Sequence, residues 1–141
     1  MALKPLVRVR PGALLRERSG FALGARAVDE LYRVAEVLSE GRRDGATFFG
    51  TTLITIELTR AFDGMELDAA TLARVSDAIF GSVRVRLRAM RLAEEDVARR
   101  FPSERIGTAH TETRFRVEGT RLYVDVDLEA SIGGSSTAVG S

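Results

Sequence analysis

The sequence contains no cysteine, tryptophan, asparagine or glutamine, and it has only one lysine and one histidine. Without cysteine the chain can form no disulfide, and it offers neither a thiol nucleophile nor a thiolate ligand for a metal. Few Asn, Gln, Cys and Met side chains are typical of hyperthermophilic proteins, and we interpret the composition as that of a thermophile. The shortage of lysine does not fit that pattern, and GC-rich codon usage is an alternative source of the arginine excess.

Long apolar runs are also missing. No stretch is long enough to span a bilayer, and the N-terminus lacks the apolar core of a signal peptide, so we expect a cytoplasmic protein without a membrane partner. The 141 residues, 45% of them hydrophobic, suit one domain that buries its own core. We place this domain at residues 1–132, with a basic segment at residues 1–18 and a disordered tail at residues 133–141.

Arginine is what the sequence has in abundance. All but one of the 21 basic residues are arginine, and they alternate with apolar residues at positions 7–10, 83–88 and 114–117. In a strand such alternation gives one apolar face and one guanidinium face. The formal net charge is only +1, so any attraction for an anionic partner has to come from local patches.

Helix and strand periodicities alternate along the chain. Residues 47–62 permit two interpretations: a strand over residues 47–59, which we prefer, or a helix through Ile54, Leu58 and Phe62. The other predicted elements are a strand at residues 6–10, a helix over 26–40, a polar turn at 42–45, a helix capped by Asp68 and ended by Gly81, a strand at 83–88, a short helix over 92–101, and strands at 108–117 and 121–132. This order predicts a single α+β domain, with an antiparallel or mixed sheet of four to five strands packed against two to three helices.

The last two strands form a predicted hairpin. A two-residue turn at Glu118-Gly119 places Arg114 opposite Tyr123 and leaves an acidic row on the same face of the second strand. The same register sets Glu112 opposite Asp125 and His110 opposite Asp127. If the strand at residues 83–88 pairs with this acidic row, Asp125, Asp127 and Glu129 neutralise Arg84, Arg86 and Arg88.

Catalytic and cofactor signatures are weak. His110, Glu112, Asp125 and Asp127 have side chains that can bind a divalent metal, but their spacing matches no metal motif, so we expect no metal and no cofactor. No nucleophile stands beside His110 in the sequence, and the glycines lack the spacing of a phosphate-binding loop. We therefore expect a protein that is not an enzyme. The enzymatic alternative uses His110 with Glu112 or Asp127 in a cleft between subunits.

Binding of single-stranded nucleic acid needs cations that follow the phosphates and flat groups on which bases stack. Arginine provides both, because a guanidinium contacts phosphate bidentately and also stacks on a base. We predict sequence-independent binding, to DNA in preference to RNA, by an arginine-rich sheet face that contains aromatic residues. The candidate residues are Arg84, Arg86, Arg88, Arg114, Arg116, Arg121, Tyr123, Phe48, Phe49, Arg8 and Arg10.

The layout resembles one family. The run Ser19-Gly20-Phe21-Ala22-Leu23-Gly24-Ala25-Arg26 before an amphipathic helix, with an arginine-bearing sheet and a thermophile's composition, is similar to the archaeal ThermoDBP-related single-stranded-DNA-binding proteins. The resemblance implies sequence-independent binding of single-stranded DNA in a cleft with an apolar floor and basic sides, and a homo-oligomer. Residues 133–141 are not the leucine zipper of the prototype, so the resemblance implies another surface for assembly.

One alternative keeps the same residues and changes their role. Under it the arginine rows form internal ion pairs, and the protein is a structural or oligomerisation protein. The position of residues 83–88 relative to the acidic row decides between the two interpretations.

Overall fold

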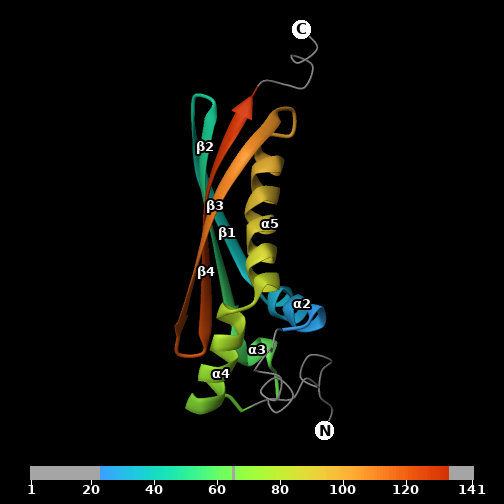
Figure 1. Ribbon diagram of the computed structural model, residues 1–141, viewed down its shortest axis with the longest axis vertical. Coiled ribbons are helices and arrows are strands. Elements are labelled where there is room, and N and C mark those ends of the chain that lie inside the picture. Colours follow the sequence, from blue (N-terminus) through green and yellow to red (C-terminus); the bar gives the residue numbers. More distant parts are fainter. Residues whose placement is uncertain (1–22, 65, 134–141) are drawn as a thin grey trace.

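Four helices and four strands make up residues 23–64 and 66–133, which are the residues that the computed structural model describes. In chain order they are α2 (Ala25–Arg33), β1 (Glu36–Asp44), β2 (Thr47–Glu57), α3 (Leu58–Ala61), α4 (Ala69–Phe80), α5 (Val83–Arg100), β3 (Arg105–Glu118) and β4 (Arg121–Gly133). The strands form one antiparallel sheet in the order β1-β2-β4-β3, so two hairpins meet through β2 and β4 (Figure 1). The predicted α+β fold is confirmed, with one short helix more than expected among the described residues.

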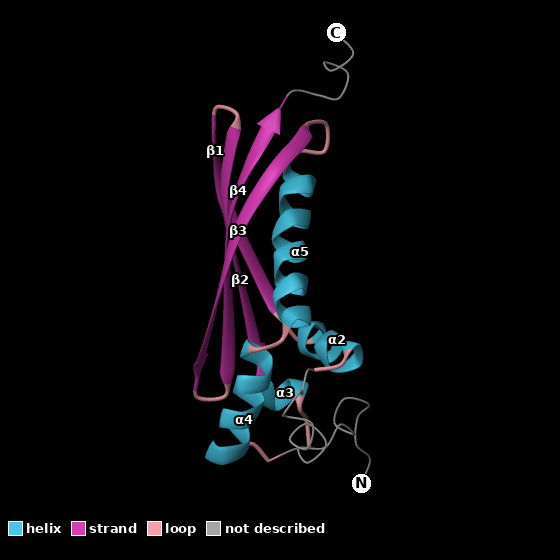
Figure 2. Ribbon diagram, viewed as in Figure 1, coloured by secondary structure: helices cyan, strands magenta, loops and turns pink. Residues whose placement is uncertain are grey.

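Helix α5 lies along one face of the sheet, and α2, α3 and α4 gather near one end of it (Figure 2). We call the side toward α5 the inner face and the other side the open face. Because side chains alternate along a strand, the even-numbered residues of β4 from Leu122 to Ile132 are buried on the inner face. Helix α5 meets them with Val85, Ala89, Ala93 and Val97, a buried stripe with a four-residue repeat.

Residues 83–88 are helical, so the predicted strand is wrong. The Ser82 side chain caps α5 by accepting a hydrogen bond of 3.1 Å from the backbone N–H of Val85. The helix then continues without a break to Arg100, so it includes nearly all of the short helix that the sequence predicted separately at residues 92–101. Alternation over six residues fits a strand, but the four-residue repeat of the buried stripe extends over the whole segment and favours a helix.

The helix predicted over residues 26–40 is too long. Helix α2 ends at Arg33, and β1 begins at Glu36 and includes most of the segment that we predicted as a polar turn. The chain reverses instead at Gly45, whose φ of 63° lies in the left-handed region that glycine adopts without strain. Asp44 pairs with Thr47 across this turn, so β1 and β2 form a tight hairpin.

Residues 47–62 contain both predicted structures. The preferred strand is confirmed as β2, and the helical alternative holds only for the single turn α3. The predicted cap at Asp68 is also confirmed, since its carboxylate accepts a hydrogen bond of 2.8 Å from the backbone N–H of Thr71. The predicted strand at residues 6–10 lies outside the described residues, and of the predicted tail only Gly133 is described, as the last residue of β4.

The hairpin of β3 and β4 has the predicted faces but a different register. Glu118 pairs with Arg121, so the two loop residues are Gly119 and Thr120 rather than Glu118 and Gly119. Gly119 has a φ of 60°, which explains its place in the turn. Each residue of β3 therefore pairs with a residue of β4 two positions later than predicted. Because successive side chains of a strand alternate between the two faces, a shift of two positions leaves every side chain on its predicted face.

The Phe48 ring fills a space that two glycines leave open near the β1–β2 turn. A Cβ atom added at Gly50 would lie 2.7 Å from the ring, and one at Gly41 would lie closer still. Phe101 packs edge-to-face on the same ring, with 5.3 Å between the centroids. Phe48 is consequently only 2% exposed. The packing of this end of the inner face therefore requires glycine at positions 41 and 50.

Gly41→Ala should lower the free energy of unfolding by about 1–3 kcal/mol, because the new methyl group displaces the Phe48 ring. Urea denaturation followed by circular dichroism measures this change. Gly81→Ala is the matched control: its Cβ would make only an ordinary 3.5 Å contact with the Asp77 carbonyl oxygen, and we expect a change within about 0.5 kcal/mol. Equal stabilities of Gly41→Ala and Gly81→Ala would contradict the position of the ring.

Candidate functional site

The predicted nucleic-acid-binding residues do not gather on one surface. Arg84, Arg86 and Arg88 belong to α5, on the inner side of the sheet, and Phe48 is in the core. The residues on the open face are Arg114, Arg116, Arg121, Tyr123 and Phe49. Arg8 and Arg10 lie outside the described residues. The single arginine and aromatic surface predicted from the sequence is therefore divided between α5 and the open face.

The open face is rich in carboxylates. It carries the odd-numbered residues of β2 and β4, the even-numbered residues of β1, and the even-numbered residues of β3 after the irregularity between Ile106 and Ala109. Its acidic residues are Glu36, Glu40, Asp44, Glu57, Glu112, Glu118, Asp125, Asp127 and Glu129, and its arginines are Arg42, Arg105, Arg114, Arg116 and Arg121. With more carboxylates than guanidinium groups, this face repels phosphate instead of attracting it.

The arginines of β3 and β4 also have partners on the open face. Arg114 Nη1 lies 3.0 Å from an Asp127 oxygen, and this hydrogen bond raises the pKa of Arg114. Arg116 lies 2.9 Å from Glu118 and over the Tyr123 ring, 4.5 Å from its centroid. The acidic row therefore belongs to a strand that lies between β2 and β3. Within the described residues, no ion pair joins this row to α5.

A hollow of about 560 Å³ lies on the open face near the β1–β2 turn. His110 lines it and is the cross-strand neighbour of Glu129 rather than of Asp127. The other charged residues around it are Glu40, Arg42, Glu112, Asp127 and Glu129. Among the described residues, no group of three or more His, Asp or Glu side chains is arranged to hold a metal ion. The hollow is an open, mainly acidic depression, and Thr51 is the hydroxyl-bearing residue in its lining among the described residues.

A second, smaller hollow of about 200 Å³ lies between α2 and α5, and we call it the α2–α5 groove. Arg84, Arg88 and Arg91 line it at i, i+4 and i+7, the spacing that puts residues on one side of a helix. Asp29 is the only carboxylate in the lining, and it forms an ion pair of 2.8 Å with Arg88. Leu87, also in the lining, is 53% exposed.

Arg84 and Arg91 differ from the other arginines of α5. Within residues 23–64 and 66–133, neither forms an ion pair. Arg86 points elsewhere, over the Phe115 ring at 4.8 Å from its centroid, and approaches the Thr113 carbonyl oxygen. Sequence reasoning missed Arg91, because the strand prediction ended at residue 88, and it missed Leu87, because that prediction put Leu87 on the apolar face of a strand. The spacing of positions 84, 88 and 91 was the signal that could have identified them.

Tyr32 connects α2 to α5 beside the groove. Its hydroxyl donates a hydrogen bond of 2.7 Å to the Val85 carbonyl oxygen, and the Arg88 guanidinium lies over its ring. Burial raises the pKa of Tyr32 well above its ordinary value, so the hydroxyl keeps its proton. This bond joins α2 to the first turns of α5.

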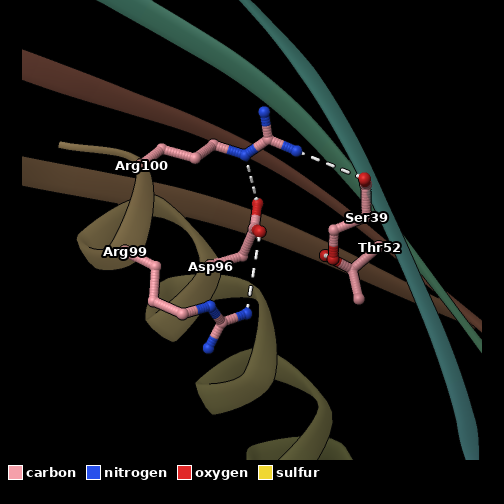
Figure 3. Close-up of polar contacts among 5 residues, drawn as sticks. All are labelled: Ser39, Thr52, Asp96, Arg99 and Arg100. Carbon is pink, nitrogen blue, oxygen red and sulfur yellow. Dashed lines mark hydrogen bonds and ion pairs between the residues drawn. The ribbon is translucent and has the colours of Figure 1, made fainter.

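The arginines near the end of α5 are bound within the chain. Arg100 is hydrogen-bonded to Asp96 at 2.7 Å and to the Ser39 carbonyl oxygen at 3.2 Å, and Arg99 lies 3.7 Å from the same Asp96 (Figure 3). The Ser39 hydroxyl in turn is 3.0 Å from that of Thr52. These contacts attach α5 to β1. Among the described residues, Arg84 and Arg91 of α5 therefore form no ion pair, whereas Arg99 and Arg100 at its end do.

Comparison of the chain with protein-family models, with curated proteins and with solved structures finds no match. Among the described residues, no helix is both long and apolar enough to cross a membrane. The resemblance to the archaeal single-stranded-DNA-binding proteins stays a prediction, and the function has to be argued from the geometry of the chain itself.

One carboxylate on the open face allows a test by pH. Glu57 accepts hydrogen bonds from the hydroxyls of Thr120 and Thr59 and lies 3.5 Å from Arg121 Nε. These contacts, the Thr120 bond first, lower the pKa of Glu57. A pKa that is lower in the folded than in the unfolded state stabilises the protein above the unfolded pKa of about 4.3, and this stabilisation is lost as the pH falls through the folded pKa.

Glu57→Gln should therefore lower the free energy of unfolding at neutral pH by less than about 1 kcal/mol, since water screens the partly exposed carboxylate. The difference from the wild type should shrink as the pH falls below about 4. Urea titrations across this pH range measure it, with Glu95→Gln on the exposed side of α5 as the control. A difference that is independent of pH would show that the Glu57 contacts do not stabilise its charged form.

Proposed function

We propose that this protein binds single-stranded nucleic acid without catalysing a reaction, and that the binding surface is the α2–α5 groove. The observation that carries the proposal is the row of Arg84, Arg88 and Arg91 along one side of α5, opposed in the groove by the single carboxylate of Asp29. Three guanidinium groups at this spacing can follow successive phosphates of a flexible strand.

The position of these arginines in the helix supports an anionic ligand. The first turn of α5 holds two arginines and no acidic residue, although the positive end of the helix dipole favours carboxylates there. A cation in this turn costs the helix a few tenths of a kcal/mol, up to about 1 kcal/mol. A bound phosphate relieves this repulsion and gains from the same dipole.

Apolar contact accompanies the charge. Leu87 and Val83 are 53% and 67% exposed beside the arginine row, and they can pack on sugars and base faces. Tyr123, the aromatic that we predicted would stack on bases, lies on the open face under Arg116. We therefore expect binding dominated by the phosphate backbone, with strong salt dependence and little base readout.

A second candidate function has its own support. The ion pairs of Arg114, Arg116 and Arg121 on the open face are those expected of a structural protein whose arginines are neutralised internally. A structural role accounts for the ion-paired arginines of the open face and of the end of α5, but it gives Arg84 and Arg91 no function.

The two candidates are separated by two triple variants. Arg84→Ala/Arg88→Ala/Arg91→Ala should weaken binding of a labelled thymidine oligonucleotide at least about tenfold at low salt. It should also weaken the salt dependence: in a plot of log K against the logarithm of the salt concentration, the slope should become less negative by about 0.7 for each lost phosphate contact. Fluorescence anisotropy measures both, with a uridine oligonucleotide as the RNA comparison.

Arg114→Ala/Arg116→Ala/Arg121→Ala is the matched control, because it removes the same number of cations from the open face. It should leave affinity nearly unchanged and lower the melting temperature. Loss of binding in the control and not in the α5 variant would move the site to the open face. A wild-type protein that binds neither oligonucleotide would contradict the proposal and leave the structural role.

A further inference from the structure

Strand β1 is an edge of the sheet, and the Arg100 side chain of α5 contacts it at the Ser39 carbonyl oxygen. The order β1-β2-β4-β3 leaves one side of β1 without a hydrogen-bonded neighbour among the described residues, and nearly every residue of the strand is exposed. Two of its apolar side chains, Val37 and Leu38, are 46% and 60% exposed. An edge with free N–H and C=O groups and exposed apolar residues is the kind that pairs with another strand.

We propose that β1 pairs antiparallel with β1 of a second copy of the chain, so that one continuous sheet runs through both subunits. The proposal does not depend on nucleic-acid binding. A continuous sheet requires opposed residues to share a face, so the sum of their numbers has to be even. This condition leaves few registers for a strand of nine residues.

The charges of β1 favour the register with Ser39 at the twofold axis. In it Glu36 opposes Arg42 of the partner subunit, and symmetry repeats this pair at the other end. Both exposed apolar residues then lie within the paired segment. All four charged side chains are on the open face, where Glu36 and Arg42 form no ion pair with another described residue.

The neighbouring registers are less favourable. With Glu40 at the axis, that carboxylate meets its own copy and Glu36 meets Asp44 of the partner subunit, so like charges oppose each other. With Gly41 at the axis, Glu40 meets Arg42 of the partner subunit, but Val37 lies beyond the paired segment. The register at Ser39 is therefore the one that combines opposite charges with apolar burial.

The other sheet edge agrees with this choice, and the pairing requires the Ser39 carbonyl oxygen to accept a bond from the partner strand beside the one from Arg100. Ser39 accepts one hydrogen bond from Arg100 on its carbonyl oxygen, and a carbonyl oxygen accepts two. The opposite edge, β3, has an irregularity between Ile106 and Ala109, and bulges of this kind interrupt edge-to-edge pairing. We therefore assign the interface to β1.

A charge exchange tests the interface. Sedimentation velocity of the wild type should show a dimer. Glu36→Arg and Arg42→Glu should each raise the dimer dissociation constant at least about tenfold, because each sets like charges opposite each other. The double variant Glu36→Arg/Arg42→Glu restores opposite charges and should restore the dimer. Arg116→Glu on the β3 edge is the control and should keep the wild-type mass.

A monomeric wild type, or single variants with an unchanged mass, would overturn the proposal. A dimer that binds no oligonucleotide would leave it standing and contradict only the proposed function. Circular dichroism shows whether each charge variant is folded.

A second variant keeps the test valid if a charge change prevents folding. The chain has no cysteine, so Ser39→Cys introduces a single thiol, which the register places beside its own copy at the axis. Opposed residues in a sheet have Cα atoms about 4.5–5.5 Å apart, within the range that a disulfide spans. Oxidation should therefore give a covalent dimer on a nonreducing gel, whereas Ser103→Cys in the loop before β3 should not. Equal crosslinking of the two variants, or none, would overturn the register.

Discussion

The packing of α5 on the inner face of the sheet is the contact on which the rest of the structure depends. Its buried stripe is made of Val85, Ala89, Ala93 and Val97, and the two alanines let the helix lie close against the apolar residues of β4. Because only one face of the sheet is covered, every strand has a buried and a solvent-facing set of side chains. The helix itself has one buried side, so Arg84, Arg88 and Arg91 lie away from the sheet, whereas Arg86 lies over the Phe115 ring of β3.

This one-sided burial separates the charges of a nearly neutral chain. Carboxylates prevail on the open face, and the first half of α5 presents the row of Arg84, Arg88 and Arg91 on the other side. A net charge of +1 therefore conceals two surfaces of opposite sign. Under the proposed function, an anionic strand would be repelled by the open face and attracted by the arginine row, so the fold would determine the direction of its approach.

Strand periodicity predicted a large part of the fold. Alternation over two residues located β2, β3 and β4 and put the side chains of the β3–β4 hairpin on the faces where they lie. The local signals of Asp68 and Gly81 located α4. These predictions succeeded because each depends on neighbouring residues, and the exact register of the hairpin, which depends on the turn, was wrong by two positions.

The errors occurred where a short pattern fits two structures. Residues 83–88 alternate like a strand, and only the longer repeat that leads to Val97 shows that they begin a helix. The β1 strand was missed because Val28, Leu31, Ala35 and Leu38 fit a helical stripe, although Asp44-Gly45 is a strong hairpin signal. The candidate site was divided because residues 83–88 are helical, which the longer repeat indicates. Strand order, in contrast, is a tertiary property that the sequence does not contain in local form.

The proposed dimer gives the charge separation a further consequence. A twofold axis through Ser39 and perpendicular to the sheet keeps the inner faces of both subunits on the same side. Both α5 helices then lie on that side, and both acidic faces lie on the other. Two arginine rows on one surface let a single flexible strand contact both subunits, which raises its apparent affinity without any new contact within a subunit. In the proposed dimer, the edge of β1 and the arginine row of α5 would therefore act together in binding one strand.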